Sequence, residues 1–357
     1  MLNPTLAAYL PMDRLHALAA GTILPEYSQG AVLLADISGF TALTEGLTYS
    51  LGTHRGAEEI ARQLGRVYDA LLPVVHRYGG SVIGFAGDAI TCYIDQDEGQ
   101  RAVACALDMQ RAMDAFQTVS LPTGTPLSLG LKVGVAVGPV RRFLVGNPQV
   151  RLLEVLAGRV LAQMAGAEKQ AQRGEVLLEG SRARQLAAHI EVTDWRRDGT
   201  NDPGYGVVRA LLMDVATTPW PALDDTRLSD EQLRPWLLPV IYARLRAGQG
   251  EFLTELRPVV ALFLRFGGID YEADAAAGAK LDAFARWVQA EAGAYGGILA
   301  DLVLGDKGSY LHVTFGAPSA HEDDPWRALR VAQVLCRPPA ELSFIQSVQI
   351  GISRGTM

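Results

Sequence analysis

The spacing of apolar residues in the first part of the chain changes from strand-like to helix-like and back. A short apolar run at 31–36 predicts a buried strand, and it leads into ISGFT, where Ser38 can cap a helix and Gly39 permits a tight turn. After a Gly-containing break near 52–56, apolar side chains recur at helical spacing in residues 56–80, which predicts that the helix continues and ends at a Gly-Gly pair. Residues 81–94 then predict two short strands around the turn Ala86-Gly87-Asp88.

An alanine-rich helix and a further strand complete this unit. The helix is predicted at 101–117 and the strand at 127–140. The resulting order of strand, helix, helix, strand, strand, helix and strand is typical of an α+β domain, in which helices cover a mainly antiparallel sheet. We therefore predict the α+β class for this region.

Much of this order returns in a weaker form toward the C-terminal end of the sequence. Residues 257–268 match the first strand and its turn, and 279–297 match the long helix with its Gly-Gly end. LADLVLGDKGSYLHVTFG then matches the hairpin, DPWRALRVAQVL matches the alanine-rich helix, and SVQIGISRG matches the last strand. The sequence thus predicts two domains of one fold in tandem.

Chain length and the segment between the two copies support this division. The 357 residues exceed the length at which one hydrophobic core usually stops growing. The intervening segment has polar, glycine-bearing and Pro-rich stretches, as in a linker, but Trp236, Leu237 and Tyr242 are too apolar to stay exposed, so we expect it to pack on a domain. The expected parts are an N-terminal helical lead-in (1–27), a first domain (28–190), a packed linker (191–256) and a second domain (257–357).

Composition and charge narrow the classes of partner. Apolar residues make up 49% and charged residues 20%, which suits a folded protein, and the net charge of −7 without a basic stripe argues against a nucleic-acid partner. The apolar runs are too short for a membrane span and the N-terminus does not resemble a signal peptide, so we expect a cytoplasmic protein without a membrane partner. Cys92, Cys105 and Cys336 are too scattered for a disulfide framework and are expected to be small buried residues.

Two carboxylates stand out as candidate metal ligands. Asp36 ends the first predicted strand, and Asp88 lies in the hairpin turn. If the two strands are neighbours in one sheet, both side chains can point at one place, and two hard oxygen donors suit Mg²⁺. The alternative is that each is an ordinary strand-end or turn aspartate.

The residues after Asp36 suggest a phosphate-binding helix start. Ser38, Gly39, Phe40 and Thr41 offer successive backbone N–H groups at a predicted helix N-terminus, which attracts phosphate. The alternative is a capped helix with Phe40 in the core. The neighbouring aspartates favour the phosphate interpretation.

Three segments carry a resemblance to a known family. ADISGFTALTE (35–45), GAEEIARQLGRVYDALLPVVHRYGG (56–80) and SVIGFAGDAI (81–90) resemble the catalytic domain of class III adenylyl cyclases. Domain order and the segment GDKGSYLHVTFGAPSAHEDDPWRALRVA further resemble the tandem cyclase domains of the soluble, bicarbonate-responsive subgroup, which includes bacterial relatives with a longer ATPase and repeat region behind them. The resemblance extends from about residue 25 to the end of the chain.

The resemblance implies two ferredoxin-like domains in a pseudo-twofold pair, with ATP at their interface and cyclic AMP as the product. It implies two Mg²⁺ ions, replaceable by Mn²⁺, held by Asp36, Asp88 and the backbone carbonyl of Ile37. Lys132 falls where the subgroup places a phosphate-contacting lysine, and the alternative for Lys132 is a strand-edge side chain that reaches solvent.

Departures from the family pattern are equally informative. The family places an Asn and an Arg on a helix after a glycine, and counting from Gly158 these positions hold Ala162 and Gly166. In the second domain Arg265 stands where the first has Asp36, and Asp306 is the only carboxylate of the corresponding turn. The metal half of the site is therefore expected in the first domain and the Asn and Arg half in the second.

The chain ends at GISRGTM, before the place where that Asn and Arg should come. We therefore expect the second domain to be truncated and the longer parent protein to continue with an ATPase and repeat region. Whether this chain is active alone stays open, as do its oligomeric state and natural activator.

Base and bicarbonate recognition also depart from the subgroup. The adenine-contacting lysine corresponds to Asp301, whose carboxylate can accept from the adenine amino group, so that ATP is expected and GTP is not excluded. The bicarbonate-binding lysine and arginine correspond to Gly84 and Ala165, so we expect no bicarbonate response through that pocket.

Three classes of function compete. The first is an ATP cyclase, the second is a nucleotide-binding regulatory module of a longer signalling protein, and the third is a structural dimerisation unit. Two intact metal carboxylates favour the first. His76 and His312 are interpreted as structural, and HEDDP (321–325) as a helix start with acidic residues in its first turn.

Overall fold

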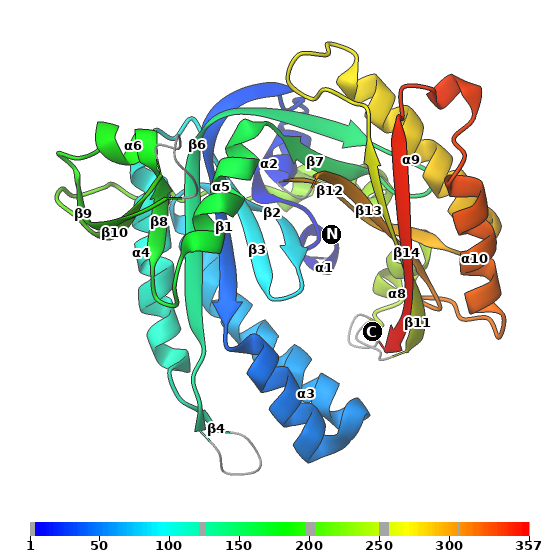
Figure 1. Cartoon of the computed structure of the whole chain (residues 1–357), viewed down its shortest axis with the longest axis horizontal. Helices are drawn as coiled ribbons and strands as arrows, with labels where there is room; N and C mark the ends of the chain where they lie inside the picture. The colour runs from blue at the N-terminus through cyan, green and yellow to red at the C-terminus, as the bar shows by residue number, and fades with distance from the viewer. Residues whose placement is uncertain (1–3, 121–125, 198–203, 250–256, 306–307, 357) are drawn as a thin grey trace.

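A computed structural model describes residues 4–120, 126–197, 204–249, 257–305 and 308–356 (Figure 1). Two mainly antiparallel sheets, each covered by helices, confirm the α+β class. The larger sheet is built from strands within residues 27–211 and the smaller sheet from residues after 257.

The larger sheet follows the order β2-β3-β1-β6-β8-β10-β9, and β7 also pairs with β6. All of these pairs are antiparallel except β6 with β8. The predicted hairpin around Asp88 is confirmed, because β2 and β3 pair on either side of it. The strands are β1 (Tyr27–Ser38), β2 (Gly80–Ala86), β3 (Ala89–Asp95), β6 (Gly130–Val145), β7 (Leu153–Ala157), β8 (Val176–Glu179), β9 (Ile190–Arg196) and β10 (Tyr205–Leu211).

Helices cover both faces of the larger sheet. On one face, α3 (Phe40–Arg77) and α4 (Gln100–Ala112) bury Leu71 and Cys105 against the strands. On the other face lies α5 (Arg159–Gln170), which packs on Val32 and Ala136. The remaining short elements of this half are η1 (Met113–Phe116), β4 (Val119–Ser120), β5 (Pro126–Leu127) and α6 (Gly180–Gln185).

The long helix α3 contains the break that its glycines predicted. Gly52 has φ 78° and ψ 171°, which interrupts the helix, and the chain continues as helix on either side. Glycine adopts positive φ without the steric cost that other residues meet. The first part of α3 therefore runs away from the sheet, at the lower edge of Figure 1.

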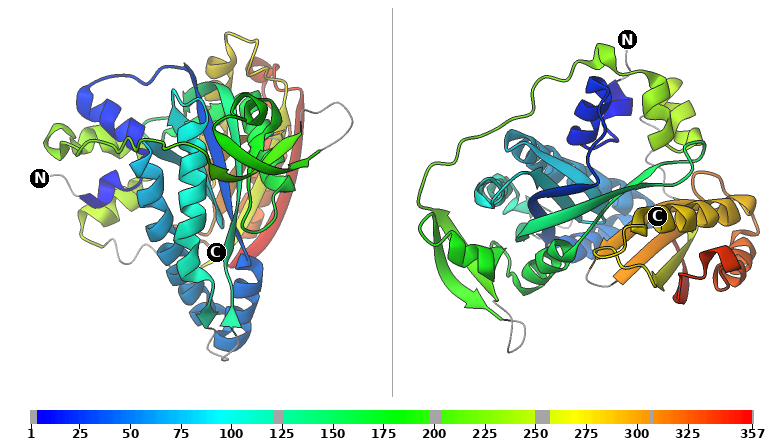
Figure 2. Two further views of the ribbon diagram at one scale, coloured as in Figure 1. Left: turned by 90° about the vertical axis from the view of Figure 1, so that its left-hand side faces the viewer. Right: turned by 90° about the horizontal axis from the view of Figure 1, so that it is seen from above.

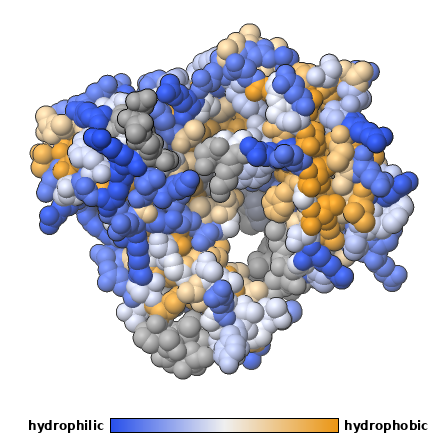
Figure 3. All heavy atoms as spheres, in the orientation of Figure 1, coloured by the Kyte–Doolittle hydropathy of each residue, from blue (hydrophilic) through white to orange (hydrophobic). Residues whose placement is uncertain are grey.

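The smaller sheet repeats the central topology of the larger one. Its order β12-β13-β11-β14 corresponds strand for strand to β2-β3-β1-β6, which confirms the internal repeat. Figure 3 shows apolar side chains gathered over β14 on the viewed face. The elements are β11 (Pro258–Gly267), α9 (Ala277–Ala294), β12 (Ile298–Gly305), β13 (Gly308–Phe315), α10 (Asp324–Leu335), η5 (Ala340–Leu342) and β14 (Ser347–Thr356).

The segment expected to be a linker has two parts. Strands β9 and β10 lie within or at the start of it, yet both belong to the larger sheet. Residues 223–245 pack with the N-terminal helices, where Trp236 and Leu237 are buried and Tyr242 is partly buried (Figure 2). The elements of this cluster are α1 (Pro4–Ala7), α2 (Met12–Ala20), η2 (Asp225–Arg227), α7 (Asp230–Leu233), η3 (Arg234–Trp236) and α8 (Pro239–Arg246).

The two sheets share a hydrophobic core. Phe143, Val145 and Val155, at the ends of β6 and β7, pack among the buried residues of α9 and the smaller sheet. Between them, the Gly146 N–H donates to Asp282 Oδ1 at 2.8 Å and the Asn147 N–H to Gln289 Oε1 at 2.7 Å. The second copy of the repeat is therefore held against the larger sheet by apolar packing and by hydrogen bonds from backbone N–H groups to side chains of α9.

Two further expectations can be compared with the structure. Cys92 and Cys105 are buried, but Cys336 is exposed because it lies just past the end of α10, outside the apolar face. Among the described helices, none has both the length and the apolar character needed to cross a bilayer.

Candidate functional site

The structure brings the two candidate metal ligands to adjacent strand ends. Asp36 lies near the end of β1, where it pairs in register with Ala89 of β3 and with Lys132 of β6. Asp88 immediately precedes β3, and its carbonyl accepts a hydrogen bond from the Ile37 N–H at 3.2 Å. The turn that carries Asp88 is thus fixed beside the end of β1.

Burial and neighbouring charges both act on the carboxyl group of Asp88 in this turn. Burial raises the pKa of the Asp88 carboxyl, and the neighbouring Asp36 adds to the increase while Lys132 opposes it. Tyr68 of α3 donates to the Gly87 carbonyl at 2.9 Å, and its ring packs edge-on against Phe85 at 5.1 Å. Tyr68 therefore supports the turn, a role that helical periodicity alone did not reveal.

The Lys132 side chain points toward the site rather than into solvent. Its Nζ lies 3.0 Å from Asp36 Oδ2 and 2.6 Å from Glu168 Oε1, and its side chain is 27% exposed. Glu168, in the last turn of α5, was not among the predicted site residues. The signal that could have identified it is a carboxylate near the C-terminal end of a helix, where the helix dipole disfavours negative charge.

The predicted helix start is present but is capped differently than expected. Gly39, with φ 93°, is the residue that precedes α3, and Ser38 makes no capping hydrogen bond. Ser38 Oγ is buried and has no hydrogen-bond partner among the described residues. A Cβ atom at Gly39 would lie 2.8 Å from the Ser128 carbonyl oxygen, so this turn requires glycine. Phe40 packs partly on the core, while Thr41 is exposed.

A cavity of about 320 Å³ lies between the two sheets beside this site. Asp36 and Glu168 line it from the larger sheet and its helix, and Asp301 of β12 lines it from the smaller sheet. Burial raises the pKa of the Asp301 carboxyl, although the Leu302 N–H at 2.8 Å and the charge of Arg151 oppose the increase. Gly84 and Ala165 also line the cavity and provide no charge.

The positions that the family assigns to its Asn and Arg carry no such groups. Ala162 is exposed on α5, and Gly166 is covered by Tyr205. A Cβ atom at Gly166 would lie 2.1 Å from the Tyr205 hydroxyl oxygen, so a larger side chain would displace that ring. In the smaller sheet, Arg265 pairs in register with Gln349, and Asp306 lies outside the described residues.

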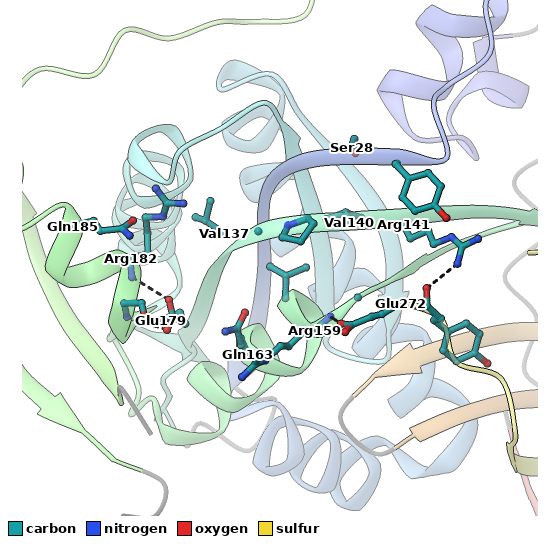
Figure 4. A pocket seen from close by; sticks show the side chains of 17 residues that line it. Ser28, Val137, Val140, Arg141, Arg159, Gln163, Glu179, Arg182, Gln185 and Glu272 are labelled. Atoms are coloured by element: carbon teal, nitrogen blue, oxygen red, sulfur yellow. Dashed lines mark hydrogen bonds between the residues drawn. The ribbon is translucent and has the colours of Figure 1, made fainter. Parts of the chain in front are cut away.

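A second and larger cavity, of about 600 Å³, was not foreseen from the sequence. It lies at the other end of α5, away from Asp36, between Arg182 and Gln185 on one side and Arg141 on the other (Figure 4). There Glu272, which belongs to the second copy of the repeat, accepts a hydrogen bond from the Arg159 N–H at 2.7 Å. The start of α5 is thereby tied to the second copy.

The donor set around Asp36 fits a magnesium ion. Asp36 and Asp88 carry carboxylates at adjacent strand ends, where the Ile37 N–H donates to the Asp88 carbonyl. Within the described ranges, no group of three or more His, Cys, Asp or Glu side chains is placed to hold a metal. Magnesium is commonly held by one or two carboxylates together with substrate phosphates, so a pair of aspartates suits it better than a complete protein cage would.

Comparison with known proteins agrees with this geometry. Residues 24–194 match the family described as Adenylate and Guanylate cyclase catalytic domain. Adenylate cyclase type 10 of Homo sapiens is 24% identical over 390 residues, which cover 98% of this chain and 23% of that protein. Adenylate cyclase 1 of Rhizobium meliloti is 27% identical over 113 residues, which cover 29% of this chain and 16% of that protein.

The crystal structure of the adenylyl cyclase CyaB from P. aeruginosa aligns with 53% of this chain and 97% of its own, at 20% identity and a TM-score of 0.43. The chain spans only about a quarter of the length of human adenylate cyclase type 10, of which it covers 23%. The family match extends from before β1 to within β9 and includes Asp36, Asp88 and Lys132. Residues 24–194, just under half of the chain, therefore resemble an adenylate and guanylate cyclase catalytic domain.

Proposed function

We propose that this chain is a nucleotide cyclase that converts a purine nucleoside triphosphate, with ATP preferred, into a 3′,5′-cyclic nucleotide and pyrophosphate. One observation carries the proposal. Asp36 and Asp88 lie at adjacent strand ends, and Asp36 faces a cavity that Asp301 lines from the smaller sheet. The carboxylates of Asp36 and Asp301 thus line one space between the two copies of the repeat, which supports a metal-nucleotide site there.

The reaction assigns roles to the residues of the site. Asp36 and Asp88 would hold the divalent cations, and the N–H groups at the start of α3 would face the triphosphate. Bound divalent cations make the ribose 3′-hydroxyl more acidic and neutralise the triphosphate charge. The 3′-oxygen forms a bond to the α-phosphorus as the bond to the bridging oxygen breaks, and pyrophosphate leaves while the hydroxyl proton passes to solvent.

Asp301 is the residue that we propose to read the base. A carboxylate accepts hydrogen bonds, and adenine offers its amino group while guanine offers two adjacent N–H donors. Similarity to adenylate cyclases favours ATP, whereas the chemistry of a carboxylate is compatible with GTP. We also propose no bicarbonate response through Gly84 and Ala165, since neither position carries charge.

A specific observation favours a second candidate, a nucleotide-binding regulatory module. The α5 positions for transition-state groups hold Ala162 and the glycine beneath Tyr205, so α5 supplies neither group and a cyclase would need both from the second copy of the repeat. Loss of one electrostatic stabiliser typically lowers the rate by about 10²- to 10³-fold. Such a module binds metal and nucleotide at Asp36 and Asp88 but forms no product.

The experiment that separates these candidates is a product assay. The purified chain is incubated with ATP or GTP and with Mg²⁺ or Mn²⁺, and cyclic nucleotide is identified by mass spectrometry. Product that disappears in Asp36→Asn supports the cyclase, and the faster triphosphate identifies the base. Metal-dependent nucleotide binding without product in any condition would instead support the regulatory module.

A further inference from the structure

The charges around Asp36 include a side chain that the proposed function does not use. Lys132 lies between two carboxylates, at 3.0 Å from Asp36 and 2.6 Å from Glu168. All three side chains are partly buried, with exposed fractions of 27%, 26% and 17% for Lys132, Asp36 and Glu168. An ion pair at this depth is screened less by salt than a surface pair.

Glu168 is brought to Lys132 by an unusually close approach of helix and strand. Gly134 lies two residues after Lys132 on β6, so both face α5. A Cβ atom at Gly134 would lie 2.4 Å from both the Met164 carbonyl oxygen and the Glu168 backbone nitrogen. The backbone of α5 therefore rests directly on β6, which fixes the position of Glu168 above Lys132.

The location of Glu168 is unfavourable without a positive partner. It lies in the last turn of α5, where the exposed helix carbonyls carry partial negative charge. Lys132 offsets this charge through the 2.6 Å ion pair. The ion pair between Lys132 and Glu168 should therefore persist when Asp36 releases Lys132 and binds a metal ion.

We propose that Glu168 is a positioning residue for Lys132, and that the Lys132 ammonium is the internal counter-ion of Asp36 until a divalent cation displaces it. On metal binding Asp36 releases Lys132, and Glu168 keeps the ammonium beside the site, ready for the triphosphate. This inference rests on the proposed function, because it uses the same pair of aspartates. It adds a competition between an internal cation and the metal.

The two members of the pair should affect metal affinity in opposite directions. Glu168→Gln removes one negative charge and leaves Lys132 to Asp36 alone, so divalent cation binding weakens. Lys132→Met removes the competing cation, so binding in the absence of nucleotide strengthens. A neighbouring unit charge commonly shifts such equilibria by a factor of about ten or more, and we expect about tenfold in each direction.

The test is a titration of the nucleotide-free chain with Mn²⁺, in which free Mn²⁺ is measured by electron paramagnetic resonance. Asp36→Asn reports whether the binding belongs to this site. Glu98→Gln is the matched control, because it removes the same charge from an ion pair with Arg182 at 2.8 Å that includes no residue of this site. Thermal melting of each variant shows that it is folded.

Opposite shifts for Glu168→Gln and Lys132→Met, with no shift for Glu98→Gln, are the expected result. A purely structural ion pair would lower the melting temperature in both variants and leave Mn²⁺ affinity unchanged, which would overturn the inference alone. Absence of Asp36-dependent Mn²⁺ binding in both the wild type and Lys132→Met would overturn the metal site of the proposed function as well.

Discussion

The two sheets have the same central topology but different chemistry at the corresponding strand ends. In the order β2-β3-β1-β6, Asp36 pairs in register with Lys132, whereas in β12-β13-β11-β14 Arg265 pairs with Gln349. The smaller sheet thus keeps the strand order without the acidic residue. The topology depends on apolar periodicity along the whole chain, while the chemistry depends on a few polar residues at strand ends.

A second contrast concerns the glycines that follow these polar residues. Gly134 lies two residues after Lys132, and Gly351 lies two residues after Gln349. A Cβ atom at Gly134 would collide with α5, whereas one at Gly351 would meet nothing within 4 Å. Phe263, which pairs with Gly351, is 46% exposed. The glycine of the larger sheet therefore serves helix packing, and that of the smaller sheet does not.

The largest expected effect comes from replacing the charged side chain at each of the two strand ends by a neutral one. Asp36→Asn should lower cyclic nucleotide formation by at least about 10²-fold, because it removes a proposed ligand of the metal that would stabilise charge in the transition state. Arg265→Gln, at the corresponding place of the smaller sheet, should reduce activity far less. Initial rates of product formation provide the comparison, and equal losses in both variants would break the distinction between the sheets.

The paired glycines provide a smaller effect on stability. Gly134→Ala should destabilise the chain by about 1–3 kcal/mol, since the methyl group meets the α5 backbone and the core must shift. Gly351→Ala should be neutral or stabilising by up to about 1 kcal/mol, because alanine loses less backbone entropy than glycine on folding. Urea unfolding of both variants measures this difference. Similar destabilisation by the two substitutions would contradict the account of α5 packing.

The smallest effect concerns one histidine from each sheet region. Burial lowers the pKa of both His76 and His312. A lowered folded-state pKa gives a stability contribution that is present above the ordinary value of about 6.5 and is lost as the pH falls toward the folded-state value. Replacement of either histidine by Gln should therefore make the free energy of unfolding fall less between pH 7.5 and pH 5.5. The expected difference from the wild type is less than about 1 kcal/mol for each histidine, because both rings are partly exposed. Unfolding midpoints at the two pH values would show no such change if the rings titrate normally.

Local sequence patterns predicted much of the fold. The internal repeat, the hairpin around Asp88 and the break in α3 near Gly52 were predicted, because each depends on apolar spacing or on glycine over a short range. The pairing of β9 and β10 into the larger sheet was not predicted, because this hairpin joins the sheet through the pairing of β10 with β8, and no pattern within the hairpin indicates that partner.

Part of the candidate site could also be predicted from the sequence. Asp36 and Asp88 were placed at adjacent strand ends from the strand pattern, and the structure agrees with that placement. Glu168 and Tyr68 were missed, because their roles arise from how α5 and α3 pack on the sheet. A pattern along one segment contains no information on which helix turn a strand residue will contact.

The most direct test of the central claim is calorimetric titration of the chain and of Asp36→Asn with a magnesium complex of a non-reactive ATP analogue. We expect Mg²⁺-dependent binding to the wild type and at least about a tenfold weaker affinity in Asp36→Asn, because the carboxylate would bind the metal that accompanies the triphosphate. Equal affinity for the two proteins, or binding that does not depend on Mg²⁺, would contradict a metal-nucleotide site at the end of β1.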